Sequence, residues 1–413
     1  MGNTALVVGL DVGQTKVAVI VAEIPGALPI DGRLRAEVIG VGVAPSLGLQ
    51  RGSIVDMARA AEAVRHARQA AERAGQAEIL CAFVGLAGDG IMSQNEAGVV
   101  PVADQSHISI ADVERAMANA RDVNLPEGRE VCFACPRSFT IDGQRGISDP
   151  VGMSGLRLEV EAHVVTALSS YRRNLEKCIV MAGVQPSSFV LEPVAAAEAV
   201  TSEAERQMGV VLIDIGGGTT DISVFHQGTP YLTACVPVGG DLVTQDISIG
   251  LRTTVASSES LKTRLGTALP LSVPEGETIE FVGADGRGAQ RQPRRFLARI
   301  VEARLEEIFD LSRRAVERAG GLANAPAGVV LTGGGSQLPG TQEVAQRVFG
   351  DVPVRLGRVE SITGDTRRIH DPSLTTCLGL VLRGGRQMLD DTAASGPEPR
   401  RVGRWVRRLL GKR

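Results

Sequence analysis

The 413-residue chain carries a net charge of −3, and 43% of its residues are hydrophobic but only 3% aromatic. This length exceeds what one hydrophobic core supports and predicts several subdomains, while the apolar runs fall short of the roughly 18 residues that a transmembrane helix needs. The first residues show no basic region followed by a cleavage site, so we expect a cytoplasmic protein. Scarce aromatic side chains argue against a nucleic-acid partner.

Two stretches of the chain share one design. Residues 7–23, VVGLDVGQTKVAVIVAE, and residues 210–228, VVLIDIGGGTTDISVFHQG, each contain an apolar strand, an aspartate, a glycine-containing turn and a second strand. The glycines of such hairpin turns expose backbone N–H groups that suit phosphate oxygens. We therefore predict two phosphate-binding turns, called here the first tip (Gly13, Gln14, Thr15 and Lys16) and the second tip (Gly216, Gly217, Gly218 and Thr219).

An aspartate ends the first strand of each hairpin. Taken alone, Asp11 or Asp214 could simply cap a turn. As a pair at equivalent places in a repeated motif, they are expected to face each other across a cleft. Because proteins usually hold Mg²⁺ with one or two carboxylates plus water and phosphate oxygens, we predict that these carboxylates bind the water shell of a magnesium ion.

The segment between the two hairpins has helix and strand patterns of its own. In HISIADVERAMANARDV, Ser109 and Asp112 precede a helical spacing of Ala and Val and predict a capped helix start. The flanking segments have the pattern of strands, and the CFAC pair at 132–135 lies in an apolar run typical of a buried strand. No second cysteine pair or nearby histidine completes a site, so we expect no metal or redox role there.

Lysine is rare in this chain, because only four of its 44 basic residues are lysines. A compact ammonium group on a flexible stem suits a point contact with phosphate or ribose. Lys16 belongs to the first tip, and Lys262 falls in SSESLKTRLG, whose pattern predicts a helix. The following stretch, 275–309, predicts a strand, a polar turn and a long amphipathic helix.

A third glycine cluster, GVVLTGGGSQLPG at 328–340, predicts a strand that runs into a glycine turn and then a helix. Backbone without side chains can pass close to a flat ligand. We expect Gly333, Gly334 and Gly335 to lie under an adenine and its ribose.

The chain ends in a basic segment, RRVGRWVRRLLGKR at 400–413, which we call the tail. Its apolar residues recur at i, i+3, i+4, i+7 and i+8, which predicts one face of a helix. They are Val402, Trp405, Val406, Leu409 and Leu410. The seven Lys and Arg of the tail, Arg407 and Arg408 among them, leave 37 basic against 47 acidic residues elsewhere. A tail that bound only phosphates would gain nothing from the apolar face, so we predict a helix at the surface of an anionic membrane.

The three glycine motifs, LDVGQTKVAVI, LIDIGGGTTDISVF and VLTGGGSQLPG, resemble the phosphate and adenosine motifs of the actin, Hsp70 and sugar-kinase ATPase superfamily. Within this superfamily, SQNEAGVVPV, DPVGMSGLRLEVEAHVVT and LEPVAAAEAV, together with the basic tail, resemble the FtsA family of bacterial cell-division proteins. The likeness runs from residue 5 to the end. One departure is Gln14, where this family usually has a small hydroxyl residue.

The resemblance implies an α/β class, with a two-lobed actin-like ATPase fold, an inserted 1C subdomain and a C-terminal amphipathic membrane helix. The first lobe would hold subdomain 1A at 1–83, 165–198 and 373–386 and subdomain 1C at 84–164. The second would hold 2A at 199–240 and 301–372 and 2B at 241–300. A flexible linker at 387–399 would lead to the helix at 400–413.

The resemblance also implies ATP and Mg²⁺ as cofactors. Glu259 and Lys262 would contact the ribose, and Glu192 would position the attacking water, although Glu192 also fits the start of a helix. Slow hydrolysis is then the most to expect. Arg294 and Arg295, at the start of the long helix in 2B, would meet the acidic C-terminal peptide of FtsZ; a solvated basic turn is the alternative.

As a function, the resemblance implies an ATP-dependent filament on the cytoplasmic face of the bacterial inner membrane at the division site. It would anchor the FtsZ ring and recruit later division proteins through subdomain 1C. Two alternatives share the nucleotide motifs: the actin-like cytoplasmic adaptor of type IV pilus assembly, and a sugar or acetate-type kinase. Neither of them needs a lipid-binding tail.

Overall fold

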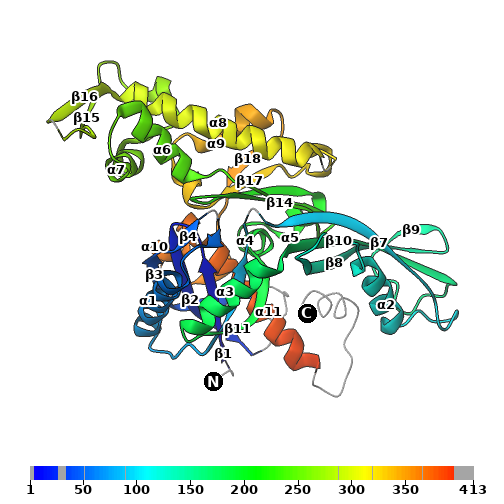
Figure 1. Cartoon of the computed structure of the whole chain (residues 1–413). Helices are drawn as coiled ribbons and strands as arrows, with labels where there is room; N and C mark the ends of the chain where they lie inside the picture. The colour runs from blue at the N-terminus through cyan, green and yellow to red at the C-terminus, as the bar shows by residue number, and fades with distance from the viewer. Residues whose placement is uncertain are drawn as a thin grey trace.

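The computed structural model describes residues 4–26, 34–50, 52–88, 90–286, 288–318, 320–364 and 366–394. They form two α/β lobes with an additional unit beside the first lobe (Figure 1). The predicted two-lobed α/β architecture with an insertion is therefore confirmed. The tail helix expected at 400–413 lies outside the described residues.

The first lobe is built on a six-stranded sheet. In spatial order its strands are β11 (Gln185–Leu191), β6 (Cys81–Leu86), β1 (Thr4–Val12), β2 (Lys16–Pro25), β3 (Ala36–Pro45) and β19 (Ile362–Thr363). Alternate side chains of β1 and β2 pack on opposite faces, which explains their continuous apolar sequence. Helices α1 (Met57–Gly75) and α3 (Ser169–Met181) cover one face, and α4 (Glu192–Val200) and α11 (Thr375–Ala394) cover the other.

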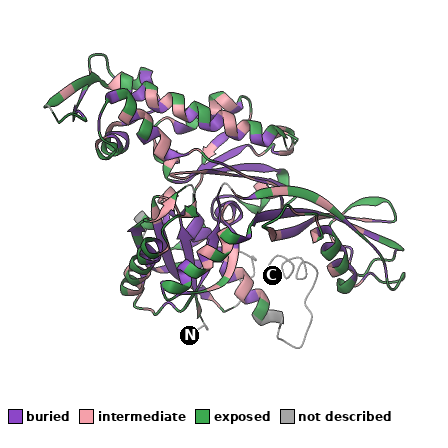
Figure 2. Cartoon of the chain, in the orientation of Figure 1, coloured by how far each residue is buried: buried purple, intermediate pink, exposed green. Residues whose placement is uncertain are grey.

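The second lobe is built on a five-stranded sheet. Its strands, in spatial order, are β14 (Thr229–Val236), β13 (Thr220–His226), β12 (Val210–Ile215), β17 (Val329–Thr332) and β18 (Val354–Leu356). One face packs against α6 (Gly240–Leu251), α8 (Arg294–Arg318) and α9 (Thr341–Phe349). The central strands of both sheets are buried, as is most of α4, whereas the edge strand β14 is only partly buried (Figure 2).

The two sheets repeat one topology. In the first lobe, β1 pairs antiparallel with β2 and parallel with β6. In the second lobe, β12 pairs in the same way with β13 and with β17. The repeat predicted at 7–23 and 210–228 thus corresponds to two equivalent hairpins, each at the centre of its sheet.

Helices α4 and α11 pack between the two sheets. One apolar cluster combines side chains of both helices with Ile20 of the first sheet and Leu212 of the second. The helices cross closely because α4 is rich in alanine and α11 has a glycine at the crossing. A Cβ added at Gly379 would lie only 1.9 Å from the carbonyl oxygen of Ala195. Helix α11 continues to Ala394, beyond the linker start expected at 387, because Leu389 is still buried in this cluster.

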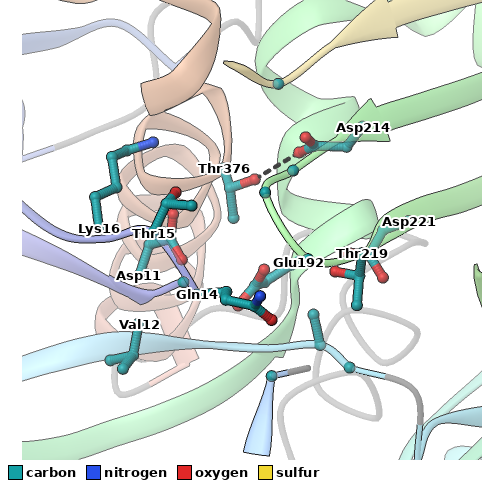
Figure 3. Close-up of a pocket in the computed structure, with 18 of the residues that line it drawn as sticks. Asp11, Val12, Gln14, Thr15, Lys16, Glu192, Asp214, Thr219, Asp221 and Thr376 are labelled. Carbon is teal, nitrogen blue, oxygen red and sulfur yellow. Dashed lines mark hydrogen bonds between the residues drawn. The ribbon is translucent and has the colours of Figure 1, made fainter. Parts of the chain in front are cut away.

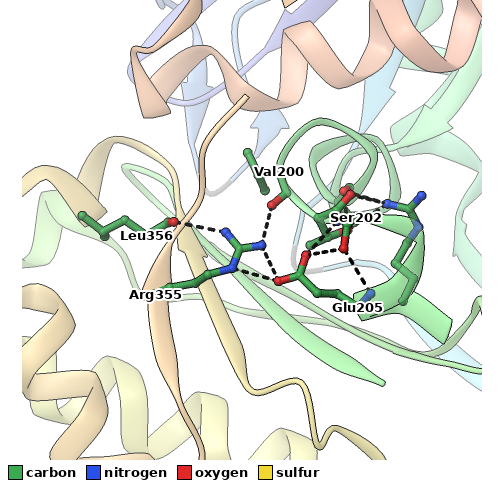
Figure 4. A network of polar contacts seen from close by, with 8 residues as sticks. Val200, Ser202, Glu205, Arg355 and Leu356 are labelled. Atoms are coloured by element: carbon green, nitrogen blue, oxygen red, sulfur yellow. Dashed lines mark hydrogen bonds and ion pairs between the residues drawn. The ribbon is translucent and has the colours of Figure 1, made fainter. Parts of the chain in front are cut away.

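The chain crosses between the lobes at two neighbouring places, which one arginine joins (Figure 4). Helix α5 (Glu203–Met208) follows α4 on the way to β12, and β18 precedes the return. Arg355 of β18 donates to the carbonyl of Val200 at 2.9 Å and to Oε1 of Glu205 at 2.7 Å. Ser202 caps α5 together with Glu205. The guanidinium therefore ties both crossings together.

The additional unit is a four-stranded sheet in the order β7 (Met92–Pro101), β10 (Arg157–Leu168), β8 (Arg129–Ile141) and β9 (Gln144–Ile147). Helix α2 (Ile110–Arg121) packs on it, and Ser109 and Asp112 form the predicted capping box. The limits of this unit differ from the expected 84–164. At its start, β6 still belongs to the first-lobe sheet up to Leu86, and at its end, β10 continues to Leu168. Cys132 and Cys135 lie in β8, both as free thiols.

The inserted unit also touches the second lobe through the edge strand β14. Ser93 Oγ of β7 donates to the carbonyl of Thr233 at 2.6 Å, and His163 Nε2 of β10 lies 3.0 Å from Thr233 Oγ1. Burial lowers the pKa of His163 to about 3, so its ring stays neutral. The Arg137 guanidinium stacks 4.2 Å above the Tyr231 ring. These contacts, called here the β14 contact, join the insertion to the opposite lobe.

The outer end of the second lobe contains the predicted 2B elements. Helix α7 (Val255–Leu265) is the helix predicted in SSESLKTRLG, and the hairpin β15 (Thr278–Val282) and β16 (Ala289–Pro293) leads directly into α8. The predicted strand, turn and long helix are confirmed, with α8 continuing to Arg318. The remaining short elements are β4 (Leu49–Gln50), β5 (Ser53–Ile54) and α10 (Thr366–Ile369).

Candidate functional site

A cavity lies between the lobes, where the two tips face each other (Figure 3). Each tip is a tight turn closed by one backbone hydrogen bond: the N–H of Gly13 donates to Lys16 O at 3.0 Å, and that of Gly216 donates to Thr219 O at 2.9 Å. Both turns extend from central strands, so the rigid sheets fix their positions. We call this cavity the cleft.

Most of the residues predicted from the sequence meet in the cleft. Those that line it are Asp11, Gly13, Gln14, Thr15, Lys16, Glu192, Asp214, Gly216, Gly217, Gly218, Thr219, Gly333 and Gly334. Gly333 has a φ of +84°, and a Cβ there would lie 2.2 Å from Asp214 Oδ1. The third glycine cluster therefore approaches the second tip as closely as backbone allows.

Three predicted residues do not line the cleft. Gly335 packs against the side chain of Ile215. Glu259 and Lys262 lie behind α6, where Lys262 Nζ contacts Glu259 Oε2 at 2.7 Å and donates to Gly240 O at 3.0 Å. Lys262 is buried, and its ammonium contacts the first residue of α6 beside the second tip.

Four carboxyl groups line the cleft, of which Asp11 is buried and Glu192, Asp214 and Asp221 are half-buried. Burial, with a smaller contribution from the neighbouring Asp214, raises the pKa of Asp11 to about 6, against the opposing charge of Lys16. Burial likewise raises the pKa of Asp221 to about 7 and that of Asp214 above its ordinary range. The pKa of Glu192 is raised well above its usual value by burial and by the other carboxylates. So many acids with raised pKa values in one cleft are typical of a functional site.

Two polar contacts connect the start of α11 to the cleft, one to Lys16 of the first lobe and one to Asp214 of the second. Lys16 Nζ donates to the carbonyl oxygen of Ser373, and Thr376 Oγ1 donates to Asp214 Oδ2 at 2.9 Å. Ser373 and Thr376 both lie in the segment that begins α11. Glu192 begins α4 and packs against the backbone of Gly85, where a Cβ would lie 2.6 Å from Glu192 Oε1.

Sequence reasoning missed several residues of the cleft, among them Asp221, Tyr171, Ser373 and Thr376. A signal for Asp221 was present, because a turn at 216–219 pairs Asp214 with Asp221 across the hairpin. The other three arrive from distant elements and show no local pattern.

The cleft offers oxygen donors, which fit a hard cation such as Mg²⁺. Within the ranges that the structure covers, however, no group of three or more His, Cys, Asp or Glu side chains is arranged to hold a metal ion by itself. The carboxylates therefore fit a hydrated ion that also needs ligand oxygens, and not a cage made by the protein alone.

Arg294 and Arg295 both bind groups within their own subdomain. Arg294 Nε donates to Leu265 O at 2.9 Å, and its guanidinium pairs with Glu277 at 2.9 Å. Arg295 Nε donates to Val273 O at 3.0 Å. Both side chains remain partly exposed.

Among the described helices, none combines the length and apolar character needed to cross a membrane.

Comparison with known proteins gives two family matches. A model described as "Cell division protein FtsA" matches residues 211–379, and one described as "SHS2 domain inserted in FTSA" matches residues 88–166. The second match coincides with the inserted unit.

Among solved structures, the chain is similar to one of the PilM–PilN type IV pilus biogenesis complex, with a TM-score of 0.66, 16% identity and coverage of 92% of this chain and 98% of that one. It is also similar to MreB5 of Spiroplasma citri bound to ADP, with a TM-score of 0.56, 15% identity and coverage of 95% and 99%. At such identities these likenesses show the actin-like fold alone.

Curated relatives match over nearly the whole chain. The chain is 37% identical to the cell division protein FtsA of Pseudomonas aeruginosa, with 97% of each chain covered. It is 34% identical to that of Escherichia coli K12, with coverage of 98% of this chain and 96% of the relative. It is 37% identical to that of Bacillus subtilis, with coverage of 92% and 84%. The chain therefore belongs to the family of the cell division protein FtsA.

Proposed function

We propose that this actin-like cell-division protein binds ATP in the cleft. The observation that carries the proposal is the pair of glycine tips facing each other from two equivalent hairpins. The first tip and the second tip would hold the phosphates from opposite lobes, and Gly333 to Gly335 would lie by the adenosine. Glu259 and Lys262 are the proposed ribose contacts, although neither side chain lines the cleft in this structure.

Asp11 and Asp214 would hold Mg²⁺ through its water shell, with Asp221 beside them. The bound ion would neutralise the phosphates and the acids together. The raised pKa values of Asp11 and Asp214 support this, because burial opposes the ionisation of both groups and a bound cation would favour it.

Glu192 is the proposed water-positioning residue, and its environment supports slow hydrolysis. A general base must be ionised to accept a proton, whereas burial and the neighbouring acids raise the pKa of Glu192 well above its ordinary value. Tight binding with slow turnover suits a switch that controls assembly.

We further propose that the protein forms filaments on the cytoplasmic face of the inner membrane, held there by the tail. Each apolar side chain of the tail gains at most about 1.5–3 kcal/mol on full burial, and ordering each residue costs about 1 kcal/mol or more. One tail is therefore a marginal anchor. Basic residues add about 1 kcal/mol each at an anionic surface, and a filament presenting many tails gains avidity without new contacts.

Such a filament would anchor FtsZ through subdomain 2B and recruit later division proteins through the inserted unit, subdomain 1C. Arg294 and Arg295 are the proposed contacts for the acidic FtsZ C-terminal peptide. The two rival functions, a pilus adaptor and a metabolic kinase, share the fold, but the near-full-length relatives are cell-division proteins.

The ATP proposal predicts that Lys16→Ala and Thr219→Ala each weaken ATP binding by about ten-fold or more and impair filament formation in parallel, because the two tips act on one ligand from opposite lobes. The measurements are ATP titration by calorimetry and electron microscopy on a lipid monolayer with and without ATP. Lys177→Ala, which removes an exposed lysine of α3, is the control. Normal assembly by a variant that no longer binds ATP would contradict the coupling.

The FtsZ proposal predicts that Arg295→Glu weakens binding of the FtsZ C-terminal peptide several-fold, because reversed charge repels acidic side chains. Arg295 is the better position to change, since Arg294 also forms an internal ion pair with Glu277. Arg318→Glu, at the far end of α8, is the matched control. Peptide binding is followed by fluorescence anisotropy, and ATP affinity should stay unchanged. Equal affinity of both variants and the parent would remove Arg295 from the site.

A further inference from the structure

Gln14 of the first tip joins the two lobes directly. Its Nε2 donates to Asp241 Oδ2 at 2.8 Å, across a separation of 227 residues in the chain. Gln14 lies in the turn between β1 and β2, whereas Asp241 lies in the first turn of α6 in the second lobe. We call this hydrogen bond the latch.

Asp241 is firmly attached to the second tip. Its backbone N–H donates to Gly217 O at 2.8 Å, and the preceding N–H, that of Gly240, donates to Gly216 O at 2.9 Å. The start of α6 and the second tip therefore move as one piece. A bond from Gln14 to Asp241 is in effect a bond from tip to tip.

The two tips can approach this closely only because residues 217 and 218 of the second tip are glycines. A Cβ added at Gly217 would lie 2.3 Å from Thr15 Cγ2, and one at Gly218 would lie 1.9 Å from Gln14 Oε1. Gln14 thus fills the space between the tips, which is where the end of a phosphate chain held by both would have to enter.

The Gln14 amide is only half satisfied. Within the described part of the chain, its Oε1 is buried and has no hydrogen-bond partner, while Nε2 holds Asp241. Burying an acceptor without a partner is unfavourable. The latch is consequently a contact that a ligand can displace.

On the basis of the proposed ATP function, we propose that Gln14 and Asp241 determine the preference of the cleft between nucleoside diphosphate and triphosphate. While the latch is closed, the Gln14 side chain occupies the entry between the tips and the Asp241 carboxyl group stands beside it. Both features oppose a terminal phosphate but leave a diphosphate room. A triphosphate must open the latch, after which the Gln14 amide N–H groups can donate to the phosphate.

The test compares the full-length parent with Gln14→Ser, Asp241→Asn and the double variant. Calorimetry with Mg²⁺ gives the dissociation constants for ADP and for a non-hydrolysable ATP analogue. Each single change should shift the ratio of the two constants by about ten-fold toward the triphosphate, since it removes bulk or charge at the entry. The double variant should shift the ratio further than either single change, because Gln14→Ser removes bulk and Asp241→Asn removes charge at the same entry.

Asp246→Asn is the matched control. It removes another carboxylate of α6, one that pairs with Arg304 away from the tips. The ratio of the two dissociation constants should equal that of the parent. Thermal unfolding establishes that each variant is folded. If Gln14→Ser does not fold, Asp241→Asn, which keeps an acceptor for the Gln14 amide, still tests the proposed role of the latch. Variants that bind both nucleotides with the parent ratio would overturn the latch and leave the ATP proposal intact. A parent protein that binds neither nucleotide overturns both proposals.

Discussion

Asp221 stands opposite Asp214 in the β12–β13 hairpin, and both carboxyl groups are enclosed by the cleft. Burial and the charge of Asp214 raise the pKa of Asp221 from 3.8 to about 7. In the unfolded chain this group loses its proton near pH 4, whereas in the folded protein it keeps the proton up to about pH 7. The folded state therefore binds more protons between these values, and the contribution of Asp221 to stability falls as the pH rises.

This sign gives a prediction for Asp221→Asn. The amide keeps the shape but cannot ionise, so the stability of the variant relative to the parent should rise between pH 5 and pH 8. One pKa unit corresponds to about 1.4 kcal/mol, which predicts a relative gain of roughly 2–3 kcal/mol over this range. Urea unfolding at several pH values, without nucleotide or Mg²⁺, measures it. A difference that is constant with pH would contradict the assigned pKa.

The sequence predicted the cleft residues unevenly, and the reason is local geometry. Asp11 and Asp214 were predicted because each precedes a glycine turn in a repeated hairpin. Asp221 was predictable from the register of the same hairpin but carries no glycine signal of its own. Tyr171 and Thr376 reach the cleft only because α3 and α11 pack there, and no local pattern announces such a tertiary approach.

At the scale of elements, the crossing of α4 and α11 determines how the two sheets are joined. A glycine inside a helix is ordinarily less stable than alanine by roughly 0.5–1 kcal/mol. At Gly379 the alternative is worse, since an added Cβ would press on the backbone of Ala195.

We therefore predict that Gly379→Ala lowers the free energy of unfolding by about 1–3 kcal/mol, the usual cost of overpacking a core. The sign alone is diagnostic, because helix propensity by itself predicts a gain. Chemical unfolding followed by circular dichroism measures the change. A variant as stable as the parent, or more stable, would show that the two helices are not packed this closely.

Element types were predictable where the sequence has strong local signals, as in the glycine hairpins and the capped helix α2. The residues at which elements begin and end were less predictable. The linker expected from residue 387 becomes polar from Asp390 onward, yet α11 continues to Ala394, and Leu389 is buried in the apolar cluster of the first lobe. The residues next to Leu389 in the sequence do not predict which part of the fold it packs against.

At the scale of the whole molecule, charge is separated between an acidic body and a basic tail, and the tail lies outside the described residues. Its function stays a prediction from sequence. If the apolar face lies among acyl chains, Trp405→Glu or Leu409→Glu should release the protein from liposomes, because a carboxylate there is costly to bury and repels anionic headgroups. Replacing Arg407 and Arg408 by Gln should weaken binding less, and chiefly for anionic lipid.

Co-sedimentation with anionic and neutral liposomes, combined with a salt titration, measures these effects. A nucleic-acid tail predicts the reverse ranking, because phosphate contacts come from the arginines and are lost in raised salt. If Trp405→Glu pellets with liposomes as the parent does, the tail is not the anchor.

The inserted unit is attached to both lobes, and two of its attachment points lie in the cleft wall. The segment that leaves β6 for the unit contributes Ala87 and Gly88 to the cleft, and α3, which follows the unit, contributes Tyr171. Another point is the β14 contact on the opposite lobe. The inserted unit is thus attached to both lobes that enclose the cleft. If the lobes separate, the unit must either tilt or lose its hydrogen bonds to Thr233. We therefore expect a ligand that changes the separation of the lobes to change the position of the inserted unit as well.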